Sequence, residues 1–313
     1  MKTFVRGNEI HKKSINNNET NDIVNRSVDT QVKIDLRKEL QNVMDTNTIF
    51  CSFELTRVKN NDFYQRKMDM YRPLFYALTW HMKNEVNNSS YLDTFKVLKN
   101  NTLVHLIANK LTRADVRIIL TKALDYSIYN IFILRGDSTN ISNDFPYAVD
   151  LVRFIRNQFG DIFCICVAGY PEMHVESPSK EMDLFYLKEK VKAGANFIIT
   201  QIFFEANIFI KFVNDCKEIG IDVPIIPGIF PISNYTCLEK IVKLCKIKIP
   251  PIILNTLQSI KDNDDKVHNY GLELSIKIIK DIIASKTTCG FHLFTLNRTS
   301  LASEICNRLG IFH

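Results

Sequence analysis

The feature that most constrains the fold of this chain is a repeating alternation of short apolar runs with longer amphipathic stretches. Runs that are apolar almost throughout are typical of strands buried on both faces, as in a parallel sheet. The stretches between them have apolar residues at helical spacing, as in 113–125, 180–193 and 267–285. Eight apolar runs rich in Ile, Val, Phe and Leu are found, at 49–55, 74–80, 102–107, 130–136, 163–170, 197–203, 224–229 and 290–297.

Eight strand–helix units are the number found in a (β/α)8 barrel, and residues 46–313 are close to its typical size of about 250 residues. The main alternative is an open, doubly wound sheet. No Gly-x-Gly-x-x-Gly sequence follows any of the predicted strands, and no P-loop motif occurs. We therefore predict an α/β fold, a single (β/α)8 TIM barrel over residues 46–313.

Residues 1–45 form a polar extension ahead of the predicted barrel. Up to about residue 28 they are rich in Asn and lack hydrophobic periodicity, which is typical of disorder. Apolar residues then recur at helix-like spacing, at Val32, Leu36, Leu40 and Val43. This spacing predicts a short helix over 28–44.

Composition excludes several functional classes. The net charge is +6 at 24% charged residues, without the clustered Lys and Arg of a nucleic-acid-binding protein. A mildly basic chain suits an anionic small substrate. No apolar run reaches the roughly 18 residues of a membrane span, and no signal peptide is present. We expect a cytoplasmic protein that binds neither nucleic acid nor membrane and that is able to form a homo-oligomer.

The eight cysteines do not indicate a metal site. None forms a Cys-x-x-Cys pair, and none stands with His at zinc-binding spacing. Most lie within apolar runs, where Cys behaves as a small hydrophobic residue. We predict reduced thiols and no bound metal.

Polar residues gather where the apolar runs end, which is where a barrel places its active site. Glu54 stands among apolar neighbours, and burial of an unpaired carboxylate is costly, so a functional role is favoured. Gln201 needs several buried partners. Spacing alone favours a core histidine at His105, and Asp137 is equally well explained as a turn former or helix cap. The polar residues at the ends of seven runs are Glu54, Thr79, His81, His105, Arg135, Asp137, Tyr170, Glu172, His174, Thr200, Gln201, Thr295, Asn297 and Arg298, with Gly136 between Arg135 and Asp137.

Long ordered motifs in the same runs carry a family resemblance. They are ALTWH (77–81), LRGD (134–137), VAGYPEMH (167–174), LKEKVKAGANFIITQIFFEA (187–206), PIIPGIFPIS (224–233) and HLFTLNR (292–298). With these motifs the chain resembles the methylenetetrahydrofolate reductases from about Cys51 to its end. The family fold is a (β/α)8 barrel, in agreement with the strand count.

The resemblance implies an oxidoreductase that binds FAD and uses NAD(P)H as co-substrate. It implies reduction of 5,10-methylenetetrahydrofolate to 5-methyltetrahydrofolate by a ping-pong mechanism, with a polyglutamylated folate as the partner. Glu54 and Asp137 are the implied catalytic residues. Glu54 would be the general acid that assists opening of the bridging ring, and Asp137 would tune the flavin and stabilise the resulting cation.

The resemblance also assigns binding positions. Those for folate are Glu54, Asp137, Gln201 and Arg298. Those for FAD are Thr79, His105, Arg135, Gly136, Asp137, Tyr147, Ala148, Ala168, Tyr170, His174, Asp183 and Lys190.

Departures from the family pattern keep other functions open. Leu55-Thr56-Arg57-Val58 replaces a Phe-Phe-Pro-Pro sequence, Ile107-Ala108 replaces Thr-Cys, and Phe294 replaces a Tyr. They motivate the alternative of a degenerate, non-catalytic paralogue that acts as a binding or interaction module. Another flavin-dependent barrel with a non-folate substrate is the third hypothesis. Eukaryotic members carry a C-terminal regulatory domain that binds S-adenosylmethionine, whereas this chain ends after the barrel, so we expect no response to that ligand.

Overall fold

The structure is a computed structural model that describes residues 33–56, 61–79, 93–136 and 144–311. The chain divides into two compact units, of which Lys33–His313 contains these residues. The other unit, Met1–Val32, lies outside the described residues. The predictions of disorder before residue 28 and of a helix starting there therefore concern residues that the structure does not describe.

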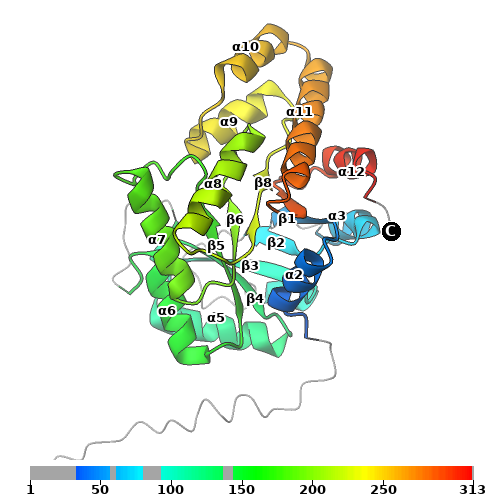
Figure 1. Cartoon of the computed structure of the whole chain (residues 1–313). Helices are drawn as coiled ribbons and strands as arrows, with labels where there is room; N and C mark the ends of the chain where they lie inside the picture. The colour runs from blue at the N-terminus through cyan, green and yellow to red at the C-terminus, as the bar shows by residue number, and fades with distance from the viewer. Residues whose placement is uncertain (1–32, 57–60, 80–92, 137–143, 312–313) are drawn as a thin grey trace, which may run out of the picture. The chain divides into compact units, whose positions relative to one another are not determined.

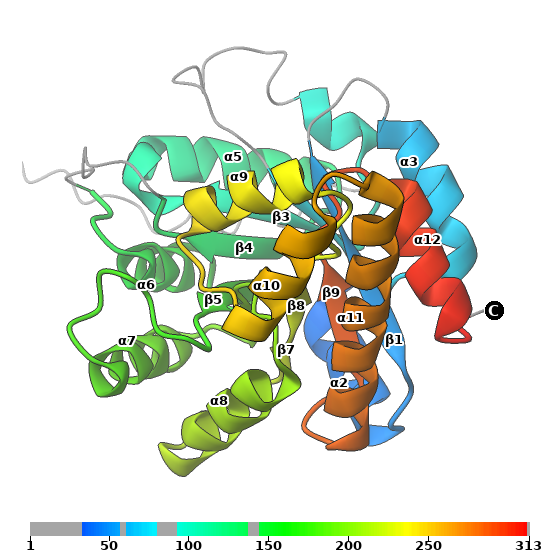
Figure 2. The same ribbon diagram turned by 90° about the horizontal axis from the view of Figure 1, so that it is seen from above.

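Parallel strands form one nearly closed sheet, which confirms the predicted barrel (Figures 1 and 2). β1 pairs with β2 on one side and with β9 on the other. β7 pairs with β6, and β8 pairs with β9, so the two short segments together make the seventh strand of the barrel. The strands are β1 (Phe50–Thr56), β2 (Tyr76–Thr79), β3 (Thr102–Ile107), β4 (Asn130–Leu134), β5 (Cys164–Gly169), β6 (Phe197–Thr200), β7 (Ile225–Ile226), β8 (Gly228–Ile229) and β9 (Gly290–Leu293).

The seventh strand is divided at Pro227, which has no N–H to donate to a ladder. Its carbonyl still accepts a hydrogen bond from the His292 N–H at 2.9 Å. The next residue, Gly228, donates its N–H to the Thr200 hydroxyl at 3.0 Å. A Cβ on Gly228 would lie 2.2 Å from the carbonyl oxygen of Thr200, so the barrel closes here only around a glycine.

Alternating strand residues fill two apolar layers. In β5, Cys164 and Cys166 belong to the cluster inside the barrel, while Ile165 and Val167 belong to the layer beneath the helices. This alternation is the pleat of a strand covered on both faces. The surrounding helices are α3 (Asn61–Met68), α5 (Arg113–Asp125), α6 (Ala148–Phe159), α7 (Lys180–Lys192), α8 (Ala206–Glu218), α9 (Tyr235–Cys245), α10 (Pro251–Ile260), α11 (Asp264–Ala284) and α12 (Thr299–Arg308).

Helix α2 (Leu36–Asp45) closes the end of the barrel at which the strands begin. Its buried residues Leu36, Leu40 and Val43 pack in the same cluster as the inward-facing strand residues. The Leu36 N–H also donates to Oδ1 of Asn130, the first residue of β4, at 3.1 Å. α2 is thus part of the barrel's core, and its observed start lies within the segment predicted as helical.

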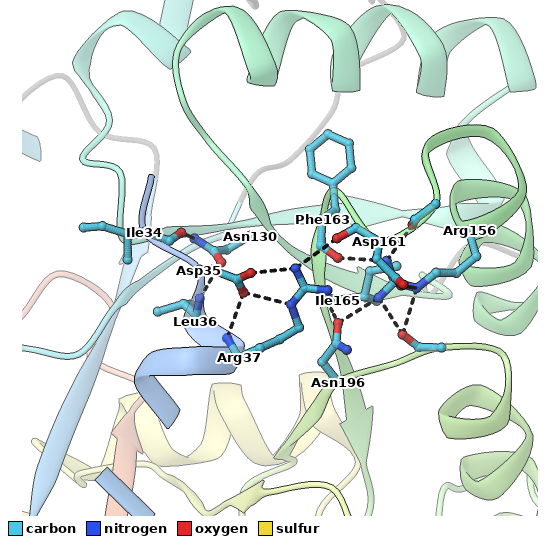
Figure 3. Close-up of polar contacts among 12 residues, drawn as sticks. Ile34, Asp35, Leu36, Arg37, Asn130, Arg156, Asp161, Phe163, Ile165 and Asn196 are labelled. Atoms are coloured by element: carbon cyan, nitrogen blue, oxygen red, sulfur yellow. Dashed lines mark hydrogen bonds and ion pairs between the residues drawn. The ribbon is translucent and has the colours of Figure 1, made fainter. Parts of the chain in front are cut away.

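A polar network fastens this end of the molecule (Figure 3). Asp35 accepts hydrogen bonds from the Arg37 guanidinium at 2.6 and 2.8 Å, and Arg37 reaches the Asp161 carbonyl at 2.9 Å. Arg156, on α6, donates to the Phe163 carbonyl at 2.8 Å and to Oδ1 of Asn196 at 2.7 Å. The network joins the segment before α2 to the loops that lead into β5 and β6.

Among the described helices, none has both the length and the apolar character that a membrane crossing needs, and the cytoplasmic location stays a prediction.

Candidate active site

Glu54 lies inside the opposite end of the barrel, where β1 finishes. Glu54 is only 7% exposed. Oε1 accepts a hydrogen bond from the Thr79 hydroxyl at 2.8 Å, and Oε2 accepts one from the Leu296 N–H at 3.1 Å. Thr79 ends β2 and Leu296 follows β9, the two neighbours of β1. The carboxylate is therefore held from both sides in a fixed orientation.

A second set of contacts supports the strand that carries Glu54. The Thr295 hydroxyl donates to the Glu54 carbonyl at 3.0 Å and is also hydrogen-bonded to the Tyr64 hydroxyl at 2.6 Å. Burial raises the pKa of Tyr64 above its ordinary value. α3 thus supplies a neutral hydroxyl that braces Thr295 beneath the carboxylate.

Arg298 and Gln201 lie at the same end of the barrel as Glu54. The Arg298 guanidinium donates a hydrogen bond to the Ser233 hydroxyl. The Gln201 side-chain oxygen accepts from the Ile202 N–H at 2.8 Å. A small pocket beside Arg298 is lined by Phe230, Pro231, Phe294, Thr295, Leu296, Leu301 and Ala302. The planar Arg298 guanidinium suits a ligand carboxylate.

A cluster of ionisable side chains follows β4 and β5. Arg135 forms an ion pair with Glu176 at 2.5 Å. His174 packs edge-on against the Tyr170 ring, with 4.6 Å between ring centroids. Burial and the Arg135 charge lower the pKa of His174. These side chains form a mixed cluster at the mouth of the barrel, in which Glu176 balances the Arg135 charge and the lowered pKa favours a neutral His174.

Lys190 completes this cluster from α7. Its ammonium group donates to the Ala168 carbonyl at 2.6 Å and lies 6.0 Å from the centroid of the Tyr170 ring. Burial lowers the pKa of Lys190 to about 8, although the charge of Asp183 acts in the opposite direction. Burial also raises the pKa of Asp183. Shifted pairs of this kind are typical of binding and catalytic sites.

The backbone after β4 approaches a neighbouring loop closely. The Asn109 side chain donates to the Gly136 carbonyl at 3.3 Å, and the Asn109 N–H donates to the Arg135 carbonyl at 3.0 Å. Gly136 has a φ of 95°, and a Cβ there would meet Asn109 Oδ1 at 2.3 Å. Gly136 therefore has to be glycine. Asp137, which follows it, lies outside the described residues, as does His81.

The remaining positions lie on β3 and α6. His105 is buried and points inward, with its ring 4.7 Å from that of Phe132 in an edge-on contact. Tyr147 is 58% exposed and precedes Ala148, the first residue of α6. The helix N-terminus there presents backbone N–H groups, which favour an anion.

These residues fit a phosphate-bearing cofactor. Arg135 and Lys190 supply cations for phosphate oxygens, His174 can donate a hydrogen bond to one, and Gly136 admits a close backbone approach. Thr79 stands apart from this cluster, because its hydroxyl is bonded to Glu54.

Several contacts of the site were not predicted from the sequence. Tyr64 comes from a polar helix, Glu176 from a loop, and the Leu296 donor is a backbone N–H, which no side-chain pattern reveals. Ser233 is the fourth. Ser233 and Leu296 lie within the motifs 224–233 and 292–298, but neither motif showed which atom would take part.

Comparisons with known proteins agree on one family. The family model described as methylenetetrahydrofolate reductase matches residues 39–310. The probable methylenetetrahydrofolate reductase (NADPH) of Caenorhabditis elegans is 40% identical over 76% of this chain and 38% of its own length. The methylenetetrahydrofolate reductase (NADH) 1 of Arabidopsis thaliana is 36% identical over 87% of this chain and 50% of its own. The chain thus spans about half the length or less of these relatives.

A solved structure shares the fold. It is an uncharacterized protein from Clostridium thermocellum, described as binding two copies of 5-methyl-5,6,7,8-tetrahydrofolic acid. The TM-score is 0.60 at 15% sequence identity, and the match covers 85% of this chain and 96% of that one. At this identity the likeness concerns the fold alone.

Proposed function

Because this chain belongs to the methylenetetrahydrofolate reductase family, we propose that it reduces 5,10-methylenetetrahydrofolate to 5-methyltetrahydrofolate with NAD(P)H and FAD. The observation that carries the proposal is the buried Glu54 carboxylate, held by two donors at the same end of the barrel as Arg135 and Lys190. An acid and an anion-binding surface at one opening are what a folate and a phosphate-bearing cofactor require.

Glu54 is the proposed general acid. The Leu296 N–H can only donate, so it keeps Oε2 as an acceptor. The Thr79 hydroxyl can accept as well as donate, so Oε1 is the oxygen that can carry a proton. Glu54 would deliver this proton to the folate nitrogen that leaves when the bridging ring opens. The carboxylate returned to its charged form is again stabilised by both donors.

FAD, when bound, would accept hydride from the nicotinamide nucleotide in one half-reaction and pass it to the folate in the other, which is a ping-pong sequence. Arg135, His174 and Lys190 would neutralise its phosphates. The other proposed contacts come from Thr79, His105, Gly136, Asp137, Tyr147, Ala148, Ala168, Tyr170 and Asp183. The role of Asp137 in tuning the flavin and stabilising the folate cation rests on the family resemblance.

Arg298 and Gln201 would hold the folate, with the guanidinium on a carboxylate and the amide on the pterin edge. The substrate is proposed to carry a polyglutamate tail. Four exposed lysines, Lys240, Lys243, Lys246 and Lys248, line α9 and the connection to α10, and within the described part of the chain none forms an ion pair. In Figure 2, α9 and α10 cross over the strands. Lysines in this place suit an anionic tail.

The test is spectroscopic. We expect the purified protein to be yellow, to release FAD on denaturation, and to be bleached in a stopped-flow instrument by NADH or NADPH. Adding methylenetetrahydrofolate to the reduced protein should restore the flavin absorbance. A protein that takes up no flavin on reconstitution would support the non-catalytic alternative. Reoxidation by a different acceptor but not by the folate would support another flavin-dependent activity.

A further inference from the structure

The segment after β9 contains two consecutive residues in the left-handed region. The φ angles are 47° at Leu296 and 60° at Asn297. Neither is glycine, and a branched apolar side chain such as that of Leu296 is disfavoured there. Backbone held in this way persists only where the surrounding contacts determine it, and it is concentrated at functional sites.

The side chain of Asn297 supplies those contacts. Its Oδ1 accepts a hydrogen bond from the Thr56 N–H at 2.9 Å, and its Nδ2 donates to the Thr56 carbonyl at 3.1 Å. The amide thus pairs with the last residue of β1 as a backbone peptide of a neighbouring strand would. The β1–β9 register ends at Phe53 and Leu293, so the side chain continues the pairing after the strand has turned away.

The same turn is fastened to Glu54 itself. The Thr295 hydroxyl accepts from the Asn297 N–H at 3.2 Å and donates to the Glu54 carbonyl at 3.0 Å. Between these two attachments lies Leu296, whose N–H donates to Glu54 Oε2. A backbone donor cannot rotate independently, so its aim depends on the geometry of the turn.

We propose that Asn297 is a positioning residue for the reaction: its side-chain amide holds the left-handed turn against β1 and thereby keeps the Leu296 N–H on the Glu54 carboxylate. This inference rests on the proposed role of Glu54 as the acid. Without the amide, Oε2 loses its fixed donor and the carboxyl group can rotate about its last bond. The proton is then no longer confined to the oxygen on the Thr79 side.

The test compares Asn297→Gly with a control at the other end of the barrel. Glycine accepts the positive φ without strain and removes the side-chain amide, while it adds backbone freedom. The control is Asn101→Ala, which removes an amide that donates to the carbonyls of Pro73 and Leu74 at 3.2 and 3.3 Å. Hydrogen–deuterium exchange of the Leu296 amide is measured on the protein without substrate. Both half-reactions are measured by stopped flow.

In Asn297→Gly we expect the Leu296 amide to exchange at least roughly 10-fold faster and the folate half-reaction to slow by roughly 10-fold, the worth of about one hydrogen bond to a charged group. Flavin reduction by NAD(P)H should stay within about 2-fold, since Glu54 gives it no proton. Asn101→Ala should change neither. An unchanged Leu296 exchange rate, or equal slowing of both half-reactions, would overturn the inference. If the wild type reduces no folate, the proposed function fails, and the exchange rates still decide whether Asn297 holds the turn.

Discussion

Replacing Glu54 with Gln should separate the two halves of the proposed reaction. Gln has the size of Glu, and its side-chain oxygen can accept from the Leu296 N–H while its NH₂ donates to the Thr79 hydroxyl. Both of these hydrogen bonds are thereby kept. What Gln lacks is an acidic proton.

The expected magnitudes differ for folding and for chemistry. Each of the two hydrogen bonds changes from charge-assisted to neutral, a loss of about 1 kcal/mol apiece. The variant no longer buries a charge, which offsets part of that loss. Stability should therefore change by no more than about 2 kcal/mol. Loss of a positioned general acid costs roughly 10²–10⁴-fold in rate, which corresponds to about 3–5 kcal/mol of barrier.

The assay follows the flavin absorbance in two stopped-flow experiments. Reduction by NAD(P)H should proceed near the wild-type rate, whereas reoxidation by methylenetetrahydrofolate should slow by the factor above. Thermal unfolding with flavin present checks that the fold is retained. Equal slowing of both steps would mean that Glu54 is structural. If neither step slows, the proton comes from another group.

Three further predictions concern other parts of the molecule. Gly228→Ala should lower stability by about 1–3 kcal/mol in urea unfolding, because its Cβ would overlap backbone at Thr200; an unchanged midpoint would contradict the close approach. FAD affinity should weaken as pH rises through about 8, because Lys190 binds phosphate only when protonated and burial lowers its pKa to about 8. In Lys190→Met, the FAD affinity measured by flavin fluorescence should no longer depend on pH in this range. If the pH dependence persists in this variant, another group causes it. Arg156→Met should lower the free energy of unfolding by about 2–4 kcal/mol, because the carbonyls of Phe163 and Gly194 lose their donor (Figure 3). The rate of flavin reduction should stay the same. Slower reduction would mean that Arg156 also helps to position the active site.

The strands were predictable because each is buried on both faces, and its sequence is therefore apolar almost throughout. Strand seven shows the limit of that reasoning. Its run 224–229 predicts one strand, but the structure has two segments, since Pro227 cannot donate to the ladder. α2 was expected from helical spacing alone, which could not reveal that it packs inside the barrel's end.

The site was predictable to the extent that side chains carry it. Burial of Glu54 followed from its apolar neighbours. Its partner Leu296 could not be predicted, because any residue type other than proline has a backbone N–H. The direction of this N–H depends on a turn whose Asn297 side chain is hydrogen-bonded to Thr56 of β1. Tyr64 was also beyond reach, since it meets Thr295 only through the tertiary fold. Asn297 appeared only as one polar strand end among many.

The divided seventh strand has a consequence for how the barrel opens. β6 is joined to β7 through two residue pairs, and β8 to β9 through two, against five between β3 and β4. Regions with few ladder bonds open at lower free energy than the rest of a protein. Protection factors of backbone amides should therefore fall first along this seam. The barrel would open along its seventh strand. Partial unfolding would therefore start beside α9 and not beside Arg135 and Lys190.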